Sequence, residues 1–232
     1  RTKSSAASDV YKRQLNTLSD ETPVLIDLKP TGDHYMEDLF KAGGLGVVLR
    51  ELKPLLNLEC LSVTGETLDE RLQSEPAYVN REVVRSFDSP IQKMGGLVSL
   101  FGSLAPGGAI LKRSAADPTL FESEGKAVVF KSLEDLANRI DDPDLEVEAH
   151  DILVLQNAGP KSDAAMPEAG YLPIPKKLAQ SGVKDMIRIS DARMSGTAYG
   201  TIVLHVTPEA AVGGPLSLVK NGDKIKISVE NR

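Results

Sequence analysis

Four polar side chains that could do chemistry gather in one short stretch, 185–200, which reads DMIRISDARMSGTAYG. They are Asp191, Arg193, Ser195 and Thr197. A serine acts as a base or nucleophile only when it loses its proton, which requires a neighbouring base or a metal ion that stabilises the alkoxide. Polar groups on a short loop between rigid strands are a common arrangement for catalysis. The pattern alone leaves a surface hairpin with ordinary turn residues as an equal alternative.

A second candidate is Glu168, which lies in the Gly-, Pro- and Ala-rich segment 157–170. Most lone loop glutamates are simply solvated. A carboxylate next to a proline is held rigidly, however, and Mg²⁺ takes one or two carboxylates and fills its other positions with water or substrate oxygens. Glu168 is therefore a candidate Mg²⁺ ligand. A weaker signal is Gly-Gly-Pro at 213–215, which could wrap a phosphate, although no strand–glycine loop–helix pattern surrounds it.

Two strands must position the 185–200 stretch. Ile187 and Ile189 alternate with polar residues, which is the period of a half-buried strand, and the apolar run 201–206 follows the polar loop. Many short strands separated by Gly, Pro and Asp turns are typical of a barrel or a sandwich. After Gly96 the pattern predicts further strands at 109–111, 127–130, 152–155 and 225–229, and helices at 133–140 and 175–180.

The first third of the chain has a different, α/β character. A buried strand is predicted at 23–28, and helices are predicted at 35–42, 45–56 and 68–73. Pro54 should end or kink the second of these helices. The periodicity weakens between residues 74 and 94, and this weak segment predicts a domain boundary.

Composition excludes several classes of protein. The 232 residues are 41% hydrophobic and carry a net charge of −6, which fits a soluble globular protein and argues against non-specific nucleic-acid binding. No apolar run reaches the length that spans a bilayer, so we expect no membrane association and a cytoplasmic location. Cys60 is the only cysteine, which rules out a disulfide or a cysteine-built metal site within one copy. The histidines show no ligand spacing, and His205, in an apolar strand run, is expected to be a core or supporting residue.

Both ends of the chain are unusual. The chain begins at Arg1, and residues 1–14 form a polar, basic run that we expect to be a tail outside the fold. The alternating strand pattern at 224–229 stops three residues before Arg232, so we expect the last domain to be truncated.

Longer stretches resemble the dihydroxy-acid and sugar-acid dehydratase family, which also includes 6-phosphogluconate dehydratase. The matching stretches follow the family's order and cover nearly all of residues 22–229. The form SDARMSGTAYGTIVLHV is closer to the sugar-acid branch, of the arabinonate or xylonate type, than to the enzymes of branched-chain amino-acid biosynthesis. The other matching stretches include TPVLIDLKPTG, MEDLFKAGGLGVVLREL, LSVTGETL, PIQKMGGLVSLFGSLAPGGAILK, VLQNAGP, MPEAGYLPIPKKL and HVTPEAAVGGPLSLVKNGD.

This resemblance implies elimination of water from a 2,3-dihydroxy acid, which gives a 2-keto acid after tautomerisation. It also implies an iron–sulfur cluster that acts as Lewis acid on the departing 3-hydroxyl, and Mg²⁺ that helps to hold the substrate. By matching motif, Ser195 corresponds to the alkoxide base that takes the C2 proton, and Thr197 corresponds to a neighbouring hydroxyl in the pocket. Glu168 corresponds to a Mg²⁺ ligand.

The chain departs from the family pattern in two places. Ser-Asp-Ala-Ala at 162–165 stands where the family has a more glycine-rich run. The cluster cysteines and the other Mg²⁺ ligands belong to family segments upstream of Thr22, which this chain does not contain, and Cys60 does not match a cluster cysteine. We therefore expect the isolated chain to be inactive.

The sequence thus predicts a tail at 1–14, an α/β remnant of an N-terminal domain at 15–89, and a β-barrel-like α+β domain at 90–232. The last resembles the swivelling domain of aconitase. We expect the parent protein to be a hydro-lyase and a homo-oligomer that acts on a small sugar acid. One alternative is a dihydroxy-acid dehydratase of branched-chain amino-acid biosynthesis. Another is a small-anion binding module that uses 213–215 and the 157–170 loop without turnover.

Overall fold

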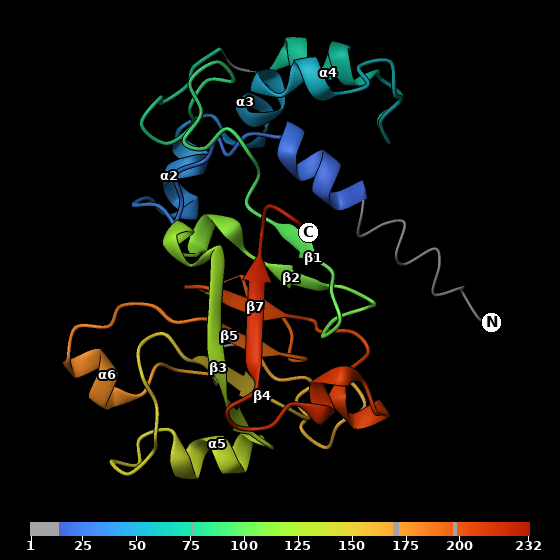
Figure 1. The fold of residues 1–232 in the computed structure, drawn as a ribbon. Coiled ribbons are helices and arrows are strands. Elements are labelled where there is room, and N and C mark those ends of the chain that lie inside the picture. The colour runs from blue at the N-terminus through green and yellow to red at the C-terminus, as the bar shows by residue number, and fades with distance from the viewer. Residues whose placement is uncertain (1–13, 76, 169–171, 197–198) are drawn as a thin grey trace. The chain divides into compact units, whose positions relative to one another are not determined.

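The computed structural model describes residues 14–75, 77–168, 172–196 and 199–232 (Figure 1). Apart from Gln14, the expected tail lies outside the described residues. The contacts divide the chain into two units. We call Leu18–Gly95 the N-terminal unit, and Gly96–Arg232 together with Arg1–Thr17 the sheet unit. The domain boundaries expected from the sequence, 15–89 and 90–232, stay predictions.

The sheet unit is built on one mixed sheet of seven strands, in the order β1-β2-β6-β5-β4-β3-β7. Neighbouring strands from β3 to β6 are parallel, whereas β1–β2, β2–β6 and β3–β7 are antiparallel. Figure 1 shows the two longest strands, β3 and β7, side by side. The strands are β1 (Val98–Leu100), β2 (Ala109–Leu111), β3 (Glu122–Phe130), β4 (Ile152–Leu155), β5 (Arg188–Ser190), β6 (Ile202–Leu204) and β7 (Lys224–Ser228).

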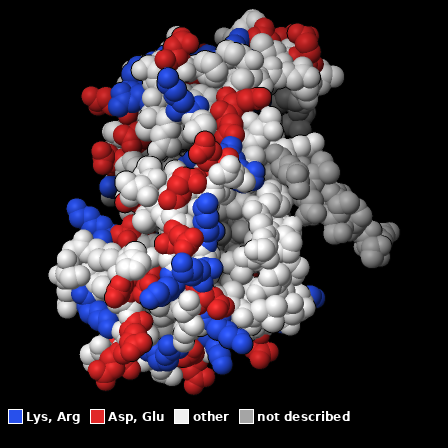
Figure 2. Space-filling model, viewed as in Figure 1, with Lys and Arg blue, Asp and Glu red and all other residues white. Residues whose placement is uncertain are grey.

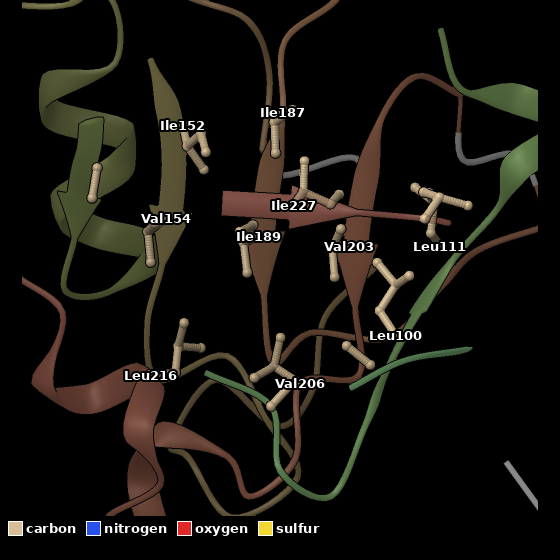
Figure 3. Packing of buried hydrophobic residues seen from close by; sticks show 14 of the residues in the cluster. Leu100, Leu111, Ile152, Val154, Ile187, Ile189, Val203, Val206, Leu216 and Ile227 are labelled. Carbon is tan, nitrogen blue, oxygen red and sulfur yellow. The ribbon is translucent and has the colours of Figure 1, made fainter. Parts of the chain in front are cut away.

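Both faces of this sheet are buried, because alternate residues of the central strands enter two different cores. On β4, Ile152 and Val154 belong to the core inside the curled sheet, whereas Leu153 and Leu155 belong to the core on its other face. Figure 3 shows the inner core, in which Ile227 of β7 packs with residues of the opposite strands. A sheet that curls around its own side chains in this way is a half-barrel.

Helices and 3₁₀ turns fill the connections of the sheet unit. The second core packs Leu136 of α5 against the outer face of the sheet. Ser132 begins α5, since its hydroxyl accepts a hydrogen bond from the N–H of Asp135 at 3.1 Å. The elements are α5 (Leu133–Arg139), α6 (Lys176–Gln180), η2 (Arg113–Ala115), η3 (Pro118–Leu120), η5 (Ala210–Val212) and η6 (Pro215–Leu218).

The N-terminal unit is mostly helical and has little sheet. Its elements are α2 (Met36–Lys41), α3 (Gly44–Glu51), η1 (Lys53–Leu55) and α4 (Leu68–Ser74). The run 23–28, predicted as a buried strand, forms only isolated bridges, in which Val24 pairs with Gln92 and Ile26 with Val84. A strand needs a continuous ladder with its neighbour, and single bridges do not supply one.

Most elements expected from the pattern are present, with ends shifted by a few residues. The helix predicted at 45–56 divides into α3 and η1, and Pro54 lies in η1, as expected for a proline that ends an α-helix. Strand β1 was not predicted. The expected barrel is confirmed only as a curled, mixed sheet, and its likeness to aconitase is not established.

Surface charge is mixed. On the face shown in Figure 2, acidic and basic side chains are interspersed, which agrees with the similar totals of 33 and 27 in the sequence. Within the described part of the chain, no helix is both long enough and apolar enough to cross a membrane.

Candidate functional site

The 185–200 stretch contains strand β5 and most of the crossover connection that joins β5 to the parallel strand β6. Strand β5 pairs in parallel with β6, in the register Arg188↔Ile202 and Ile189↔Val203. Residues 191–201 therefore run from the end of β5 back to the start of β6. The alternative of a surface hairpin is wrong, because a hairpin joins antiparallel strands.

A buried polar cluster anchors the base of this crossover. Arg188 is 7% exposed, and it donates to the Asp185 carboxylate at 2.9 Å and to the carbonyls of Leu172 and Tyr199. The other Asp185 oxygen accepts from both the N–H and the hydroxyl of Thr201, each at 2.7 Å. Burial lowers the pKa of Arg188, and the Asp185 carboxylate opposes this shift. The satisfied cluster holds the crossover rigidly at its root.

Gly200 is required where the crossover passes this cluster. Its φ is +99°, and a Cβ at this position would lie 2.0 Å from Nη2 of Arg188. Only glycine combines the left-handed backbone with so close an approach. The main-chain N–H of Gly200 donates to the carbonyl of Ala115 at 2.7 Å, which fixes this end of the crossover to η2.

Asp191 fixes the other end of the crossover. It is 1% exposed, and its two oxygens accept from the N–H groups of Ala158 and Ala210, both at 2.8 Å. Ala158 follows β4, and Ala210 follows β6. One buried carboxylate therefore joins the ends of three neighbouring parallel strands. Asp191 is consequently occupied in holding loops together.

The loop after β4 is held by a second carboxylate. Glu209 is 7% exposed, and both of its oxygens accept from the N–H of Lys161, at 2.8 and 3.1 Å. A Cβ at Gly159 would lie 1.9 Å from the Glu209 carboxylate, so this loop approaches too closely for any larger residue. The loop that leads to Glu168 therefore starts from a well-fixed position.

Glu168 and Arg193 bring the two candidate loops together. They form an isolated parallel bridge, and Nη2 of Arg193 lies 2.8 Å from Oε1 of Glu168. Both side chains are about half exposed, at 48% for Arg193 and 45% for Glu168. Glu168 thus lies beside a residue only two positions before Ser195. Thr197 lies outside the described residues.

The segment before Glu168 has an unusual backbone. Ala165 and Met166 have φ values of +52° and +58°, in the left-handed region where glycine is favoured. These residues fall at and beside the run 162–165, where the resemblance described above implied a more glycine-rich segment. A non-glycine residue in this region costs about 1–2 kcal/mol. The departure from the family pattern therefore coincides with local backbone strain.

Ser195 is half-buried, and main-chain groups of the residues before and after it are hydrogen-bonded to other side chains. The N–H of Met194 donates to Nε2 of His205 at 2.7 Å. The carbonyl of Gly196 accepts from Nζ of Lys112 at 2.9 Å, and burial lowers the pKa of Lys112. His205 is a supporting residue, as expected, but it follows β6 with a φ of +54° and is not within the strand.

The described residues do not by themselves fit the implied metal groups. Among them there is no cluster of three or more His, Cys, Asp or Glu side chains that could hold a metal ion. Cys60 is exposed, and a single thiolate cannot hold an iron–sulfur cluster. The Glu168 carboxylate is paired with Arg193, so a cation there would compete with a guanidinium.

The proposed anion site at 213–215 is also disfavoured. The N–H of Gly213 donates to the carbonyl of Ala210, and the N–H of Gly214 donates to the carbonyl of Glu209. An anion site of this kind needs backbone N–H groups that point at the ligand. The first of these bonds closes a 3₁₀ turn and the second spans five residues, so both amides are occupied within the chain and the segment does not form a phosphate cradle.

Several supporting residues were missed by the sequence reasoning. Lys112 follows an ordinary apolar strand, and Arg188 alternates with isoleucines as an exposed strand residue would. Their partners Gly196 and Leu172 lie 84 and 16 positions away, respectively. No local signal marks such contacts, although an arginine between two buried strand residues is a weak hint of a paired charge.

Comparison with known proteins identifies two matching family segments. Residues 82–232 match the family described as dihydroxy-acid/6-phosphogluconate dehydratase C-terminal, and residues 4–71 match the corresponding N-terminal family. The chain is 48% identical over 227 residues to a 6-deoxy-6-sulfo-D-gluconate dehydratase of Pseudomonas putida, which covers 97% of the chain and 39% of that protein.

Two other relatives show the same partial coverage. An L-arabonate dehydratase of Azospirillum brasilense is 48% identical over 90% of the chain and 36% of its own length. A dihydroxy-acid dehydratase of Caldicellulosiruptor bescii is 40% identical over 94% of the chain and 39% of its own length. The chain therefore spans about two fifths of the length of these curated relatives.

Proposed function

Because the chain belongs to the dihydroxy-acid/6-phosphogluconate dehydratase family, we propose that its parent protein removes water from a sugar acid such as arabinonate or xylonate. The observation that carries this proposal is the gradation in identity. Relatives named for sugar acids are 46–48% identical to the chain, whereas those named dihydroxy-acid dehydratase are 38–42% identical. The product would be a 2-keto-3-deoxy acid.

In the proposed reaction the Ser195 alkoxide takes the proton from C2 as the C3–O bond breaks, and the resulting enol tautomerises to the 2-keto acid. The departing hydroxide is protonated and leaves as water, and return of the proton that Ser195 gained balances this step. A base must be held in a fixed position to act on so weak an acid. The geometry supports Ser195 in this role, because its neighbours Met194 and Gly196 are both hydrogen-bonded to side chains of other segments. Thr197 is proposed to supply a neighbouring hydroxyl.

We propose that Glu168 is the contribution of this chain to a Mg²⁺ site, and that Arg193 holds its carboxylate in the absence of the metal. The proposal places the other Mg²⁺ ligands, and the cysteine ligands of the iron–sulfur cluster, in parts of the parent protein outside this chain. It follows that the isolated chain should have no dehydratase activity. We also propose that the sheet unit corresponds to an aconitase-like swivelling domain, and that the parent is a cytoplasmic homo-oligomer.

The alternative of a small-anion binding module has less support. The amides that would form its site are donors to groups of the chain itself, to Asp191 from Ala158 and to Glu209 from Lys161. The alternative of a branched-chain dihydroxy-acid dehydratase differs only in substrate, so it is decided by the assay below.

The experiment measures 2-keto acid formation by the parent-length enzyme from arabinonate, xylonate, 6-deoxy-6-sulfogluconate and 2,3-dihydroxyisovalerate. We expect a sugar acid to be the best substrate. Ser195→Ala should lower kcat by about 10²–10⁴-fold, which is typical for loss of a general base. Ser181→Ala, at an exposed serine after α6, is the matched control and should leave kcat unchanged.

Three results would contradict the proposal. Preference for 2,3-dihydroxyisovalerate would favour the branched-chain alternative, and near-normal turnover by Ser195→Ala would mean that another residue is the base. Turnover by the isolated 232-residue chain would show that the metal chemistry has been assigned to the wrong residues.

A further inference from the structure

The residues before and after Ser195, Met194 and Gly196, are each hydrogen-bonded through a main-chain group to a side chain from another part of the sequence. On the N-terminal side, the N–H of Met194 donates to Nε2 of His205 at 2.7 Å. On the C-terminal side, the carbonyl of Gly196 accepts from Nζ of Lys112 at 2.9 Å. Ser195 therefore lies between two fixed points that are one residue away on either side.

Such support is needed because the described residues of the crossover form no helix. Backbone N–H and C=O groups in regular elements bond to one another, but those of an irregular segment must find other partners. In the crossover, the N–H of Arg193 donates to the carbonyl of Pro167, and the N–H of Gly200 donates to the carbonyl of Ala115. Between these points, His205 and Lys112 contact the main chain at the residues before and after Ser195.

His205 is itself held firmly at the end of β6. Its N–H donates to the carbonyl of Ala192 at 2.9 Å, and its carbonyl accepts from the hydroxyl of Thr207 at 2.9 Å. Its φ of +54° is unusual for a residue other than glycine, and such strain persists only where the surroundings enforce it. As an acceptor at Nε2, the imidazole must be neutral and must carry its proton on Nδ1.

Lys112 reaches the crossover from a different strand. It follows β2, which pairs with β6 in the register Ile110↔Leu204 and Leu111↔Val203. Because these strands are antiparallel, the register places Lys112 level with Ile202 at the start of β6, whereas His205 follows the end of β6. The crossover runs between these two ends, so the two side chains contact it at successive points along its path.

We propose that His205 and Lys112 are positioning residues that fix the main chain on either side of Ser195 and thereby hold its hydroxyl in the geometry needed for proton abstraction. This inference rests on the proposed role of Ser195 as the base. Misplacement of a catalytic group by about 1 Å can lower a rate by about 10²-fold. The two hydrogen bonds supply the constraint against such movement.

The first test needs no enzymatic activity. In the ¹⁵N-labelled 232-residue chain at neutral pH, we expect a scalar coupling across the hydrogen bond between the amide nitrogen of Met194 and Nε2 of His205. The ¹⁵N shifts of His205 should report the tautomer protonated at Nδ1. An Nε2-protonated ring, or a Met194 amide that exchanges freely with solvent, would overturn the inference about His205 and leave the proposed function untouched.

The second test uses matched pairs of variants in the parent-length enzyme. His205→Phe removes the acceptor, whereas His205→Gln keeps a side-chain oxygen that can accept, and both share the positive φ. Lys112→Met removes the donor, whereas Lys112→Arg keeps one. We expect kcat to fall by about 10²-fold in the Phe and Met variants with little change in KM, and to recover substantially in the Gln and Arg variants.

Equal kcat values within each pair, or an effect confined to KM, would overturn the positioning role. Thermal melting of all four variants separates this outcome from general destabilisation, since a purely structural role would lower Tm and kcat together. If Ser195→Ala retains normal turnover, the proposed function itself fails. The scalar coupling between Met194 and His205 does not depend on that result, so failure of the proposed function and failure of the positioning inference can be told apart.

Discussion

Elements of both the sheet unit and the N-terminal unit were predicted from the sequence, yet the two units differ in the size of their hydrophobic cores. The sheet unit buries side chains on both faces of a seven-stranded sheet. The N-terminal unit has one small core, made of Ala42, Val47, Val48, Val83 and Val84, and its strand pairings are isolated bridges. Local pattern therefore predicts which elements form, but the stability of a unit depends on how many elements share a core.

The exposed apolar residues of the N-terminal unit reinforce this contrast. Phe40 is 81% exposed, and Leu45 and Leu61 are also largely exposed. Helices as short as α2 and α4 are marginal in isolation, so they depend on tertiary packing for their stability. In the sheet unit, by comparison, an irregular crossover, and strained residues such as Ala165, Met166 and His205 near it, are tolerated because they are anchored to a well-packed sheet.

The largest expected effect is a difference in hydrogen exchange between the two units. Amides of β4 should exchange only when the sheet unit unfolds, whereas amides at the bridges of Ile26 and Val84 should exchange through local opening. We expect protection factors to differ by roughly 10³-fold, measured by NMR or mass spectrometry at neutral pH. Equal protection in both units would show that they unfold as one cooperative block.

Next in size is the loss of the buried arginine beneath the crossover. Arg188→Met leaves Asp185 buried without its cationic partner, and breaking such a pair costs about 3–5 kcal/mol. Arg193→Met is the matched control, because it removes a half-exposed pair with Glu168 that should contribute less than about 1 kcal/mol. The loss in unfolding free energy of each variant is measured by urea unfolding of the sheet unit, with amide exchange in β4 as the probe. Similar losses from the two variants would contradict the view that Arg188 anchors the crossover.

A matched pair of core valines compares the two units directly. Val154 of β4 and Val84 of the N-terminal unit are both fully buried. Val154→Ala and Val84→Ala should each lower the stability of their own unit by about 2 kcal/mol. The Val84 variant should speed exchange only within Leu18–Gly95, and the Val154 variant only within the sheet unit. Effects that spread across both units would mean that the units are energetically coupled.

The smallest expected effect concerns two helix caps. Ser132 caps α5 and Thr67 caps α4, each by accepting from the N–H three residues on, at 3.1 and 3.2 Å. Ser132→Ala and Thr67→Ala should each cost about 1 kcal/mol. Because the N-terminal unit has less stability to lose, its α4 amides should show the larger proportional rise in local exchange. If Ser132→Ala produced the larger rise, the sheet unit would not be the more stable of the two.

The sequence by itself determined the local elements and most of the candidate residues. Short apolar runs between Gly, Pro and Asp turns located six of the seven strands, two of them with period-two alternation. The capping residue Ser132 located the start of α5. Strand β1, with three residues in the run VSL, was too short to stand out from its surroundings. Family motifs indicated Ser195, Thr197 and Glu168, whose roles stay predictions.

Only the tertiary structure decided how these elements meet. The same two strand patterns, β5 and β6, suit either a hairpin or a crossover, and the parallel register was decided by the sheet as a whole. The contact of Lys112 with Gly196 spans 84 positions, and the pair of Glu168 with Arg193 joins separate loops. Hydrophobic periodicity acts over a few residues, whereas these contacts depend on chain topology. The support of Ser195 therefore becomes visible only in the folded chain.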